Sequence, residues 1–169
     1  MGAPQEGPTN RFSDARPPAR ILVVSDGVAT GRRQDRAGPQ LVDRLRDAGF
    51  DVAPVQVTAD GTEAVQGALR TMVAGFAGLV VTTGGTGFGP RDLTPEGTTL
   101  VIERHAPGLA EAMRLASPLG RLSRAVAGSV GQALVLNLPG SPSGAVECLD
   151  AVLDVVPHAL ALLRGEHLH

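Results

Sequence analysis

The feature that most constrains the fold of this chain is an apolar run that ends at a glycine-rich loop. The residues after the loop are typical of the start of a helix. The run spans residues 80–83, and the loop at 84–89 carries four glycines within six residues. Thr94, Pro95 and Glu96 then have the residue types typical of an N-cap, a first helical position and a first turn. A loop so poor in side chains lets backbone N–H groups approach an anion closely. The segment therefore predicts a strand, an anion-binding loop and a helix in succession.

Composition excludes several classes of function. A chain of 169 residues with a net charge of −2 fits one domain and has no basic field for nucleic acid. It contains no Trp or Tyr to stack on bases, and no Lys for a P-loop or a Schiff base. No apolar run approaches the ~20 residues of a membrane span, and no signal-peptide core is present. We expect a cytoplasmic protein with no nucleic-acid or membrane partner.

Apolar runs alternate with helical patterns along the chain. Residues 1–19 read as a flexible leader, 20–165 as one domain and 166–169 as a C-terminal tail. We expect strands at 21–24, 51–57, 79–82, 125–130 and 133–138, and helices at 39–48, 94–105 and 108–119. Another helix is expected after Asp60-Gly61, with Val65, Leu69, Met72 and Val73 as its apolar positions. A last long helix through Leu163 is expected to kink at Pro157. The pattern predicts an α/β fold, a single three-layer α/β/α domain with a mostly parallel central sheet.

Polar residues follow several of the expected strands. In a parallel sheet, ligands bind beyond the carboxyl ends of the strands. Asp26, Asp60 and Asp92 all follow strands, and carboxylates without Lys or zinc ligands suit Mg²⁺. Each has a structural alternative: a turn or N-cap for Asp26 and Asp60, and an Asx-type turn or cap for Asp92. Ser141, before the last helix, is likewise either an N-cap or an anion contact.

Arginines near these loops are candidate phosphate ligands. The guanidinium group can pair with phosphate through two hydrogen bonds, although most arginines are solvated surface residues. The candidates are Arg91, Arg114, Arg121 and Arg124.

Four segments together resemble one known family. They are Ser25-Asp26, residues 82–96, residues 123–128 (Ser-Arg-Ala-Val-Ala-Gly) and residues 137–142 (Asn-Leu-Pro-Gly-Ser-Pro). In this order and spacing they resemble the MogA/MoaB family of molybdenum-cofactor biosynthesis proteins, which is related to the G domain of gephyrin. The resemblance runs from about Ile21 to Leu163 and is to the compact branch. One departure is Asp35-Arg36-Ala37-Gly38, where family members commonly have Asp-x-Ser-Gly.

The resemblance implies a fold, an activity and a set of site residues. The implied activity is molybdopterin adenylyltransferase: AMP passes from Mg-ATP to the terminal phosphate of molybdopterin, and pyrophosphate is released. By motif, the catalytic and Mg²⁺-binding carboxylates fall on Asp60 and Asp92. Substrate or nucleotide binding is expected at Ser25, Asp26, Thr83, Gly84, Gly85, Thr86, Gly87, Glu111, Ser123, Pro139, Gly140 and Ser141.

The resemblance also implies partners and leaves one alternative open. Molybdopterin and ATP are the expected ligands, and the expected assembly is a homotrimer, with a hexamer in one branch. Apolar positions Leu109, Ala112, Met113 and Ala116 are the expected uncovered surface for that assembly. The enzyme that inserts molybdate downstream is an expected partner. The alternative is a non-catalytic molybdopterin-binding paralogue with a regulatory or carrier role.

Overall fold

One mixed sheet forms the centre of the molecule. The computed structural model describes residues 15–166, so most of the expected leader and tail lies outside it. The sheet has seven strands in the order β2-β1-β4-β7-β6-β5, with β3 also paired to β1. Their bounds are β1 Pro18–Val24, β2 Asp51–Val52, β3 Gln56–Thr58, β4 Leu79–Thr83, β5 Arg104–His105, β6 Ala127–Val130 and β7 Ala133–Leu138.

Strands β1 to β4 and β7 pair in parallel, whereas β6 pairs antiparallel with both β7 and β5. This confirms a mostly parallel sheet. The antiparallel edge follows from the short turn at Gly131, which has a φ of +54° and joins β6 directly to β7. A connection this short can only reverse the chain, because a parallel pair needs a crossover of a dozen or more residues.

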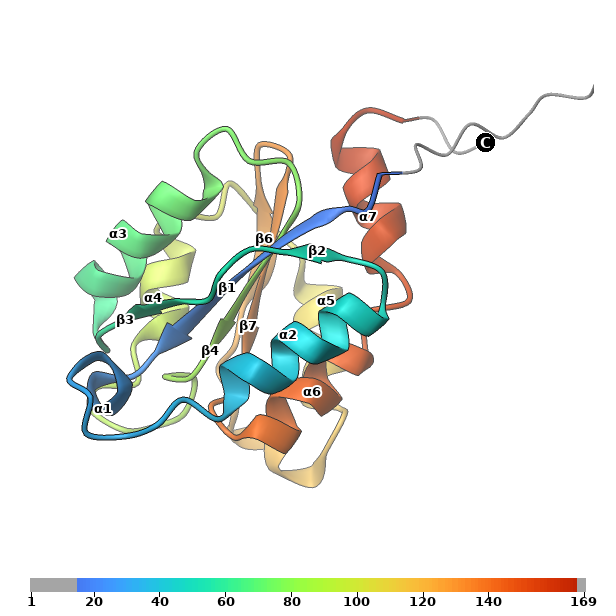
Figure 1. Cartoon of the computed structure of the whole chain (residues 1–169). Coiled ribbons are helices and arrows are strands. Elements are labelled where there is room, and N and C mark those ends of the chain that lie inside the picture. Colours follow the sequence, from blue (N-terminus) through green and yellow to red (C-terminus); the bar gives the residue numbers. More distant parts are fainter. Residues whose placement is uncertain (1–14, 167–169) are drawn as a thin grey trace, which may run out of the picture.

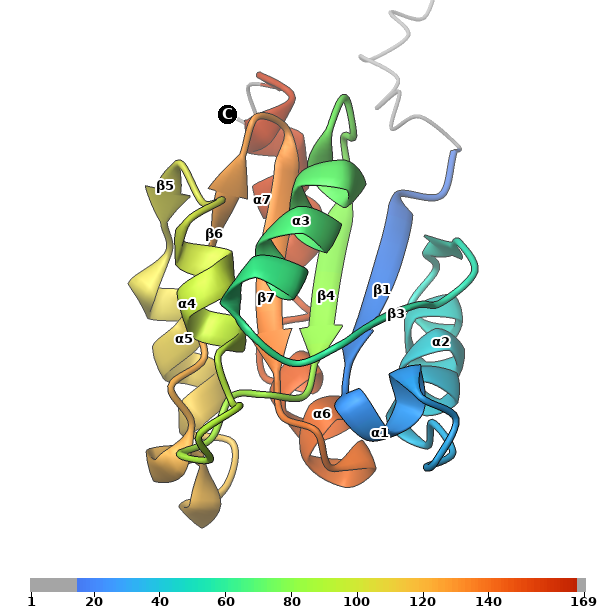
Figure 2. The same cartoon turned by 90° about the vertical axis from the view of Figure 1, so that its left-hand side faces the viewer.

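Helices cover both faces of the sheet and give the expected three layers (Figures 1 and 2). One face carries α3 and α4, and the other carries α2, α5, α6 and α7. The bounds are α1 Asp26–Ala29, α2 Ala37–Asp47, α3 Thr62–Val73, α4 Thr94–Thr99, α5 Pro107–Arg114, 3-10 helix η1 Pro118–Leu122, α6 Pro142–Asp150 and α7 Val156–Leu163. In the described part of the chain, none of the helices has the length and apolar character that crossing a bilayer requires.

The central strands are apolar throughout because each of them is covered on both sides. In β4, Leu79 and Val81 pack with the helices of one face, and Val80 packs with α3 on the other. All three side chains are fully buried. Because successive side chains of a strand point to opposite faces of the sheet, one continuous apolar run contributes to two separate cores.

Four expected elements were wrong in extent. The helix expected at 108–119 ends at Arg114, and residues 118–122 form the separate 3-10 helix η1. The helix expected at 94–105 ends at Thr99, because Arg104 and His105 pair with β6 as strand β5. The last helix is two helices: α6 ends at Asp150 and α7 starts at Val156, with turns between. Pro157 lacks an N–H and its ring clashes with a carbonyl one turn back, which favours its place in the first turn of a new helix. The strand at 51–57 is interrupted around Pro54 and forms β2 and β3.

Candidate active site

The carboxyl ends of β1, β3, β4 and β7 meet at one end of the sheet (Figure 2). Backbone hydrogen bonds fix the loops that leave these strands to one another. Ser25 donates its N–H to Thr58 O at 3.0 Å, and Gly84 donates its N–H to Leu138 O at 3.1 Å. The hydroxyl of Thr83 donates to Pro139 O at 2.7 Å. The loops that were predicted to meet at this end of the sheet are therefore held to one another by hydrogen bonds. Together they form the floor of the site.

Glycine is required where these loops touch. Gly84 has a φ of +104°, and a Cβ there would lie 2.3 Å from Val24 O. A Cβ on Gly140 would lie 3.3 Å from the Cα of Gly84. Three loops thus pack backbone against backbone; a side chain at Gly84 would force them apart, and one at Gly140 would require a small shift of Gly84. The N–H of Gly84 is used inside the protein, whereas the N–H of Gly85 has no acceptor among the described residues.

Asp26 and Asp60 form a reciprocal pair above this floor. The N–H of Asp26 donates to Asp60 Oδ2 at 2.8 Å, and the N–H of Asp60 donates to Asp26 Oδ1 at 3.1 Å. The N-cap of α3 is Gly61, and the N-cap of α1 is Ser25, whose hydroxyl accepts from Val28 N–H at 3.3 Å. The N-cap interpretation is therefore wrong for both carboxylates.

Arg91, from the glycine-rich loop, closes the pair. Its Nε and Nη2 donate to the two oxygens of Asp26 at 2.6 and 3.1 Å, and Nη2 also donates to Asp60 O at 2.9 Å. This hydrogen-bonded guanidinium lowers the pKa of Asp26 and raises the pKa of Arg91 itself. The result is a fixed backbone position for Asp60.

Asp92 belongs to a local turn but keeps one oxygen free. Its Oδ2 accepts the N–H of Gly89 at 2.9 Å, and its own N–H donates to Gly89 O at 3.0 Å. The interpretation of Asp92 as a turn residue is thus correct, but it accounts for only one of the two carboxylate oxygens. Its Oδ1, like Oδ1 of Asp60, accepts no hydrogen bond from the described residues. Each of the two carboxylates is oriented by one oxygen and has the other available.

Arg124 holds the far side of the glycine-rich loop. Its Nε donates to Gly87 O at 2.8 Å, and its Nη2 donates to Asp92 O. It also forms an ion pair with Glu96 in the first turn of α4, and this pairing lowers the pKa of Glu96. Thr94 is not the N-cap of α4; Leu93 is, and the Thr94 hydroxyl donates to Gly84 O at 2.8 Å. The loop is anchored at both ends.

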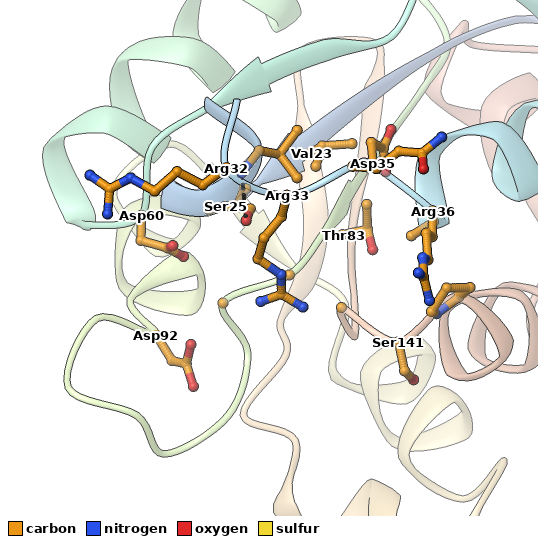
Figure 3. A pocket seen from close by; sticks show the side chains of 18 residues that line it. Val23, Ser25, Arg32, Arg33, Asp35, Arg36, Asp60, Thr83, Asp92 and Ser141 are labelled. Atoms are coloured by element: carbon orange, nitrogen blue, oxygen red, sulfur yellow. Dashed lines mark hydrogen bonds between the residues drawn. The ribbon is translucent and has the colours of Figure 1, made fainter. Parts of the chain in front are cut away.

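A cleft of about 830 Å³ opens over this floor. In Figure 3, Asp60 and Asp92 lie on one side of it and Ser141 on the other, with Thr83 between. Its lining is Val23, Val24, Ser25, Val28, Arg32, Arg33, Gln34, Asp35, Arg36, Ala37, Asp60, Thr83, Gly84, Gly85, Asp92, Gly140, Ser141 and Pro142. Ser141 occupies the N-cap position of α6, but its hydroxyl makes no capping bond and so can contact a ligand.

The cleft brings together most of the expected site residues but not all of them. Those that line it are Ser25, Asp60, Thr83, Gly84, Gly85, Asp92, Gly140 and Ser141, and Asp26 and Pro139 contact these residues through hydrogen bonds. Thr86, Gly87, Glu111 and Ser123 do not line it. Thr86 O accepts the N–H of Arg124, Ser123 Oγ accepts the N–H of Ala125, and Glu111 is exposed on α5.

The arginines at the cleft are not the expected ones. All four expected phosphate ligands are engaged by the protein: Arg91 by Asp26, Arg124 by Glu96, Arg114 by Ala125 O and Arg121 by Pro118 O. The cleft is lined instead by Arg32, Arg33 and Arg36, from the segment between α1 and α2. The sequence feature that could have identified this cationic segment is the occurrence of three arginines within five residues.

The chain belongs to a known family. Residues 20–158 match the family described as "probable molybdopterin binding domain", and the chain is a member of the MogA/MoaB group of molybdenum cofactor biosynthesis proteins. It is 34% identical to the molybdopterin adenylyltransferase of Helicobacter pylori over 157 residues, which is 88% of each chain. It is also 34% identical to a molybdenum cofactor biosynthesis bifunctional protein of Synechococcus elongatus, over 96% of this chain and 52% of that protein.

The fold agrees with solved structures of the family. The molybdopterin biosynthesis enzyme MoaB of Thermus thermophilus superposes with a TM-score of 0.83 at 43% identity, covering 90% of this chain and 99% of that one. These matches confirm the expected family, the expected α/β fold and a place in molybdenum cofactor biosynthesis. The chain covers 88% and 99% of the two compact relatives and 52% of the bifunctional one.

Proposed function

We propose that this protein adenylylates molybdopterin, using Mg-ATP and releasing pyrophosphate. One observation carries the proposal: Asp60 and Asp92 line the same cleft, over a floor of strand ends and glycine loops, and the Oδ1 of each accepts no hydrogen bond from the described residues. The family membership and the adenylyltransferases among the relatives supply the substrate class.

The reaction is a displacement at phosphorus that conserves electrons and atoms. An oxygen of the terminal phosphate of molybdopterin forms a bond to the α-phosphorus of ATP. The bond from that phosphorus to the α,β-bridging oxygen breaks, and pyrophosphate leaves with the electron pair. Such transfers depend mainly on alignment and on neutralising charge. Gly85 N–H and the amino end of α6, beside Gly140 and Ser141, are the groups that hold phosphate oxygens here.

The two carboxylates suit Mg²⁺ bound together with a nucleotide. The described residues contain no cluster of three or more His, Cys, Asp or Glu side chains that could hold a metal. Mg²⁺ at nucleotide sites commonly takes one or two carboxylates, with phosphate oxygens and water completing the octahedron. The free oxygens of Asp60 and Asp92 match that requirement. When bound, the ion supplies positive charge to the phosphates and orients them.

The expected assembly, partners and location remain proposals. Of the surface expected to be uncovered, Met113 is buried, Leu109 and Ala112 pack on the core but are only partly buried, and Ala116 is exposed. Large apolar side chains are exposed instead at Phe88, Leu115, Leu119 and Leu122. We propose that a homotrimer, as the family resemblance implies, covers these side chains, and that the product passes to a molybdate-inserting enzyme in the cytoplasm, where ATP is available. Light scattering tests the assembly; a concentration-independent monomer mass contradicts it.

The activity is tested by incubating the purified chain with molybdopterin, ATP and Mg²⁺. We expect adenylylated molybdopterin by mass spectrometry, and no product when Mg²⁺ is chelated. The Helicobacter pylori relative is the positive control. Tight binding of molybdopterin without any consumption of ATP, under conditions in which the control is active, identifies the non-catalytic alternative and contradicts the proposal.

A further inference from the structure

One wall of the cleft is cationic, and the proposed function has so far given its arginines no role. Arg32, Arg33 and Arg36 line it between α1 and α2. Their guanidinium groups form no hydrogen bond or ion pair with any residue from 15 to 166. Because the chain contains no Lys and Arg91 and Arg124 are engaged, these three are the cations that the cleft offers to a ligand.

Arg33 is seated so that it reaches into the cleft. Its aliphatic stem crosses α1 at Gly27, where a Cβ would lie 2.6 Å from Arg33 Cδ and 2.9 Å from Cγ. Its N–H donates to Gly27 O at 3.0 Å, which fixes the backbone as well. From there the side chain extends between the side of the cleft that carries Asp60 and Asp92 and the side that carries Ser141 (Figure 3).

Arg32 and Arg36 lie on opposite sides of Arg33. Figure 3 shows Arg32 extending toward Asp60 and Arg36 lying near Ser141. Arg32 therefore lies on the side of the two carboxylates, Arg33 lies between the two sides, and Arg36 lies on the side formed by the start of α6.

We propose that Arg32 and Arg33 bind the β- and γ-phosphates of ATP and the pyrophosphate that leaves. The inference rests on the proposed function and assigns the leaving-group side of the same cleft. Breaking the bond to the α-phosphorus places additional negative charge on the bridging oxygen. Guanidinium groups with free donors, next to carboxylates that suit Mg²⁺, neutralise that charge without an internal ion pair having to break first.

Binding of inorganic pyrophosphate with Mg²⁺ tests this directly, by isothermal titration of the purified full chain. We expect Arg33→Gln to weaken binding about tenfold, because a charge-assisted hydrogen bond is worth roughly that factor. The double variant Arg32→Gln/Arg33→Gln should weaken it further. Arg46→Gln is the matched control: it removes the same charge from the far end of α2, outside the cleft, and should bind as the wild type does.

AMP lacks the β- and γ-phosphates. Its binding therefore reports on the rest of the cleft and not on the proposed pyrophosphate site. AMP should bind the double variant within about twofold of its wild-type affinity, and the melting temperature should be unchanged. Pyrophosphate binding that is equal in the wild type and the double variant overturns the inference, even if adenylylation is observed. If pyrophosphate binding depends on both arginines but no adenylylated product forms, the anion site stands and the proposed function fails.

Discussion

Asp26 and Asp60, which are 34 residues apart, each donate a backbone N–H to the carboxylate of the other. The two bonds, of 2.8 and 3.1 Å, lock the ends of β1 and β3 to each other. Arg91 then bridges both residues from the glycine-rich loop. Asp60, which lines the cleft, is thus oriented by Asp26 and by Arg91, and neither of these two residues lines the cleft. Asp26 and Arg91 are positioning residues for Asp60.

Replacing Arg91 should therefore impair activity through Asp60. In Arg91→Gln the bidentate contact with Asp26 is lost, and we expect turnover to fall about 10- to 100-fold, the range found when groups that orient ligands are removed. The Mg²⁺ concentration for half-maximal rate should rise. Arg91→Lys should restore activity only in part, because an ammonium group cannot form the two-pronged contact. Initial rates across a Mg²⁺ series measure this, and an unchanged Mg²⁺ dependence contradicts the positioning role.

Asp92→Asn separates charge from geometry. Asn can still accept the N–H of Gly89, so the local turn should survive. The charge at the free oxygen is lost, and we expect turnover to fall at least ~100-fold, the scale on which losing one electrostatic stabiliser acts. Steady-state rates and a melting curve test the variant together. Wild-type turnover at a normal melting temperature limits Asp92 to its role in the turn.

The pairing of Glu96 with Arg124 predicts a pH dependence of stability. Arg124 lowers the pKa of Glu96 in the folded protein below its unfolded value of about 4.3. The stabilisation is therefore complete above that value and is lost as pH falls through the lower, folded-state pKa. Thermal unfolding of the wild type and Glu96→Gln should differ most at pH 6–7, and the difference should shrink as the pH falls below the unfolded value and through the folded-state pKa. A difference that is absent at pH 6–7, or that grows as the pH falls, contradicts the pairing.

Gly84 should not tolerate a side chain. Gly84→Ala places a Cβ 2.3 Å from Val24 O at a φ of +104°, so the strand ends must separate. The left-handed backbone alone costs about 1–2 kcal/mol, and in a chain of this size each kcal/mol lowers the melting temperature by about 2–4 °C. Gly67→Ala, in an open position on α3, is the control and should be neutral or stabilising. Equal melting temperatures for the two variants refute this.

Hydrophobic patterning predicted the fold because both faces of the sheet are covered. Runs such as 79–83 and 133–138 must be buried, and loops at their ends must meet in a parallel sheet. The helix expected at 94–105 failed because pairing of Arg104 and His105 with β6 is a tertiary effect. Local pattern contains no information about a partner strand that lies more than twenty residues later.

The carboxylates were predictable and the arginines were not. Asp60 and Asp92 follow strands, and their place at the cleft follows from topology. Whether an arginine is free or engaged depends on acceptors that are distant in sequence, as Asp26 is from Arg91 at a separation of 65 residues. The sequence therefore favoured Arg91 and Arg124, which stabilise the loop, and overlooked Arg32 and Arg33, which face the cleft.

The fate of isotopically labelled ATP tests the central claim most directly. With molybdopterin and Mg²⁺, label at the α-phosphorus should appear in the pterin product in equal amount to the pyrophosphate released. Label at the γ-phosphorus should appear in pyrophosphate alone. Transfer of the γ-label to the pterin would contradict attack at the α-phosphorus. Release of labelled AMP with no label on the pterin would contradict molybdopterin as the acceptor, and either result contradicts the proposed adenylylation.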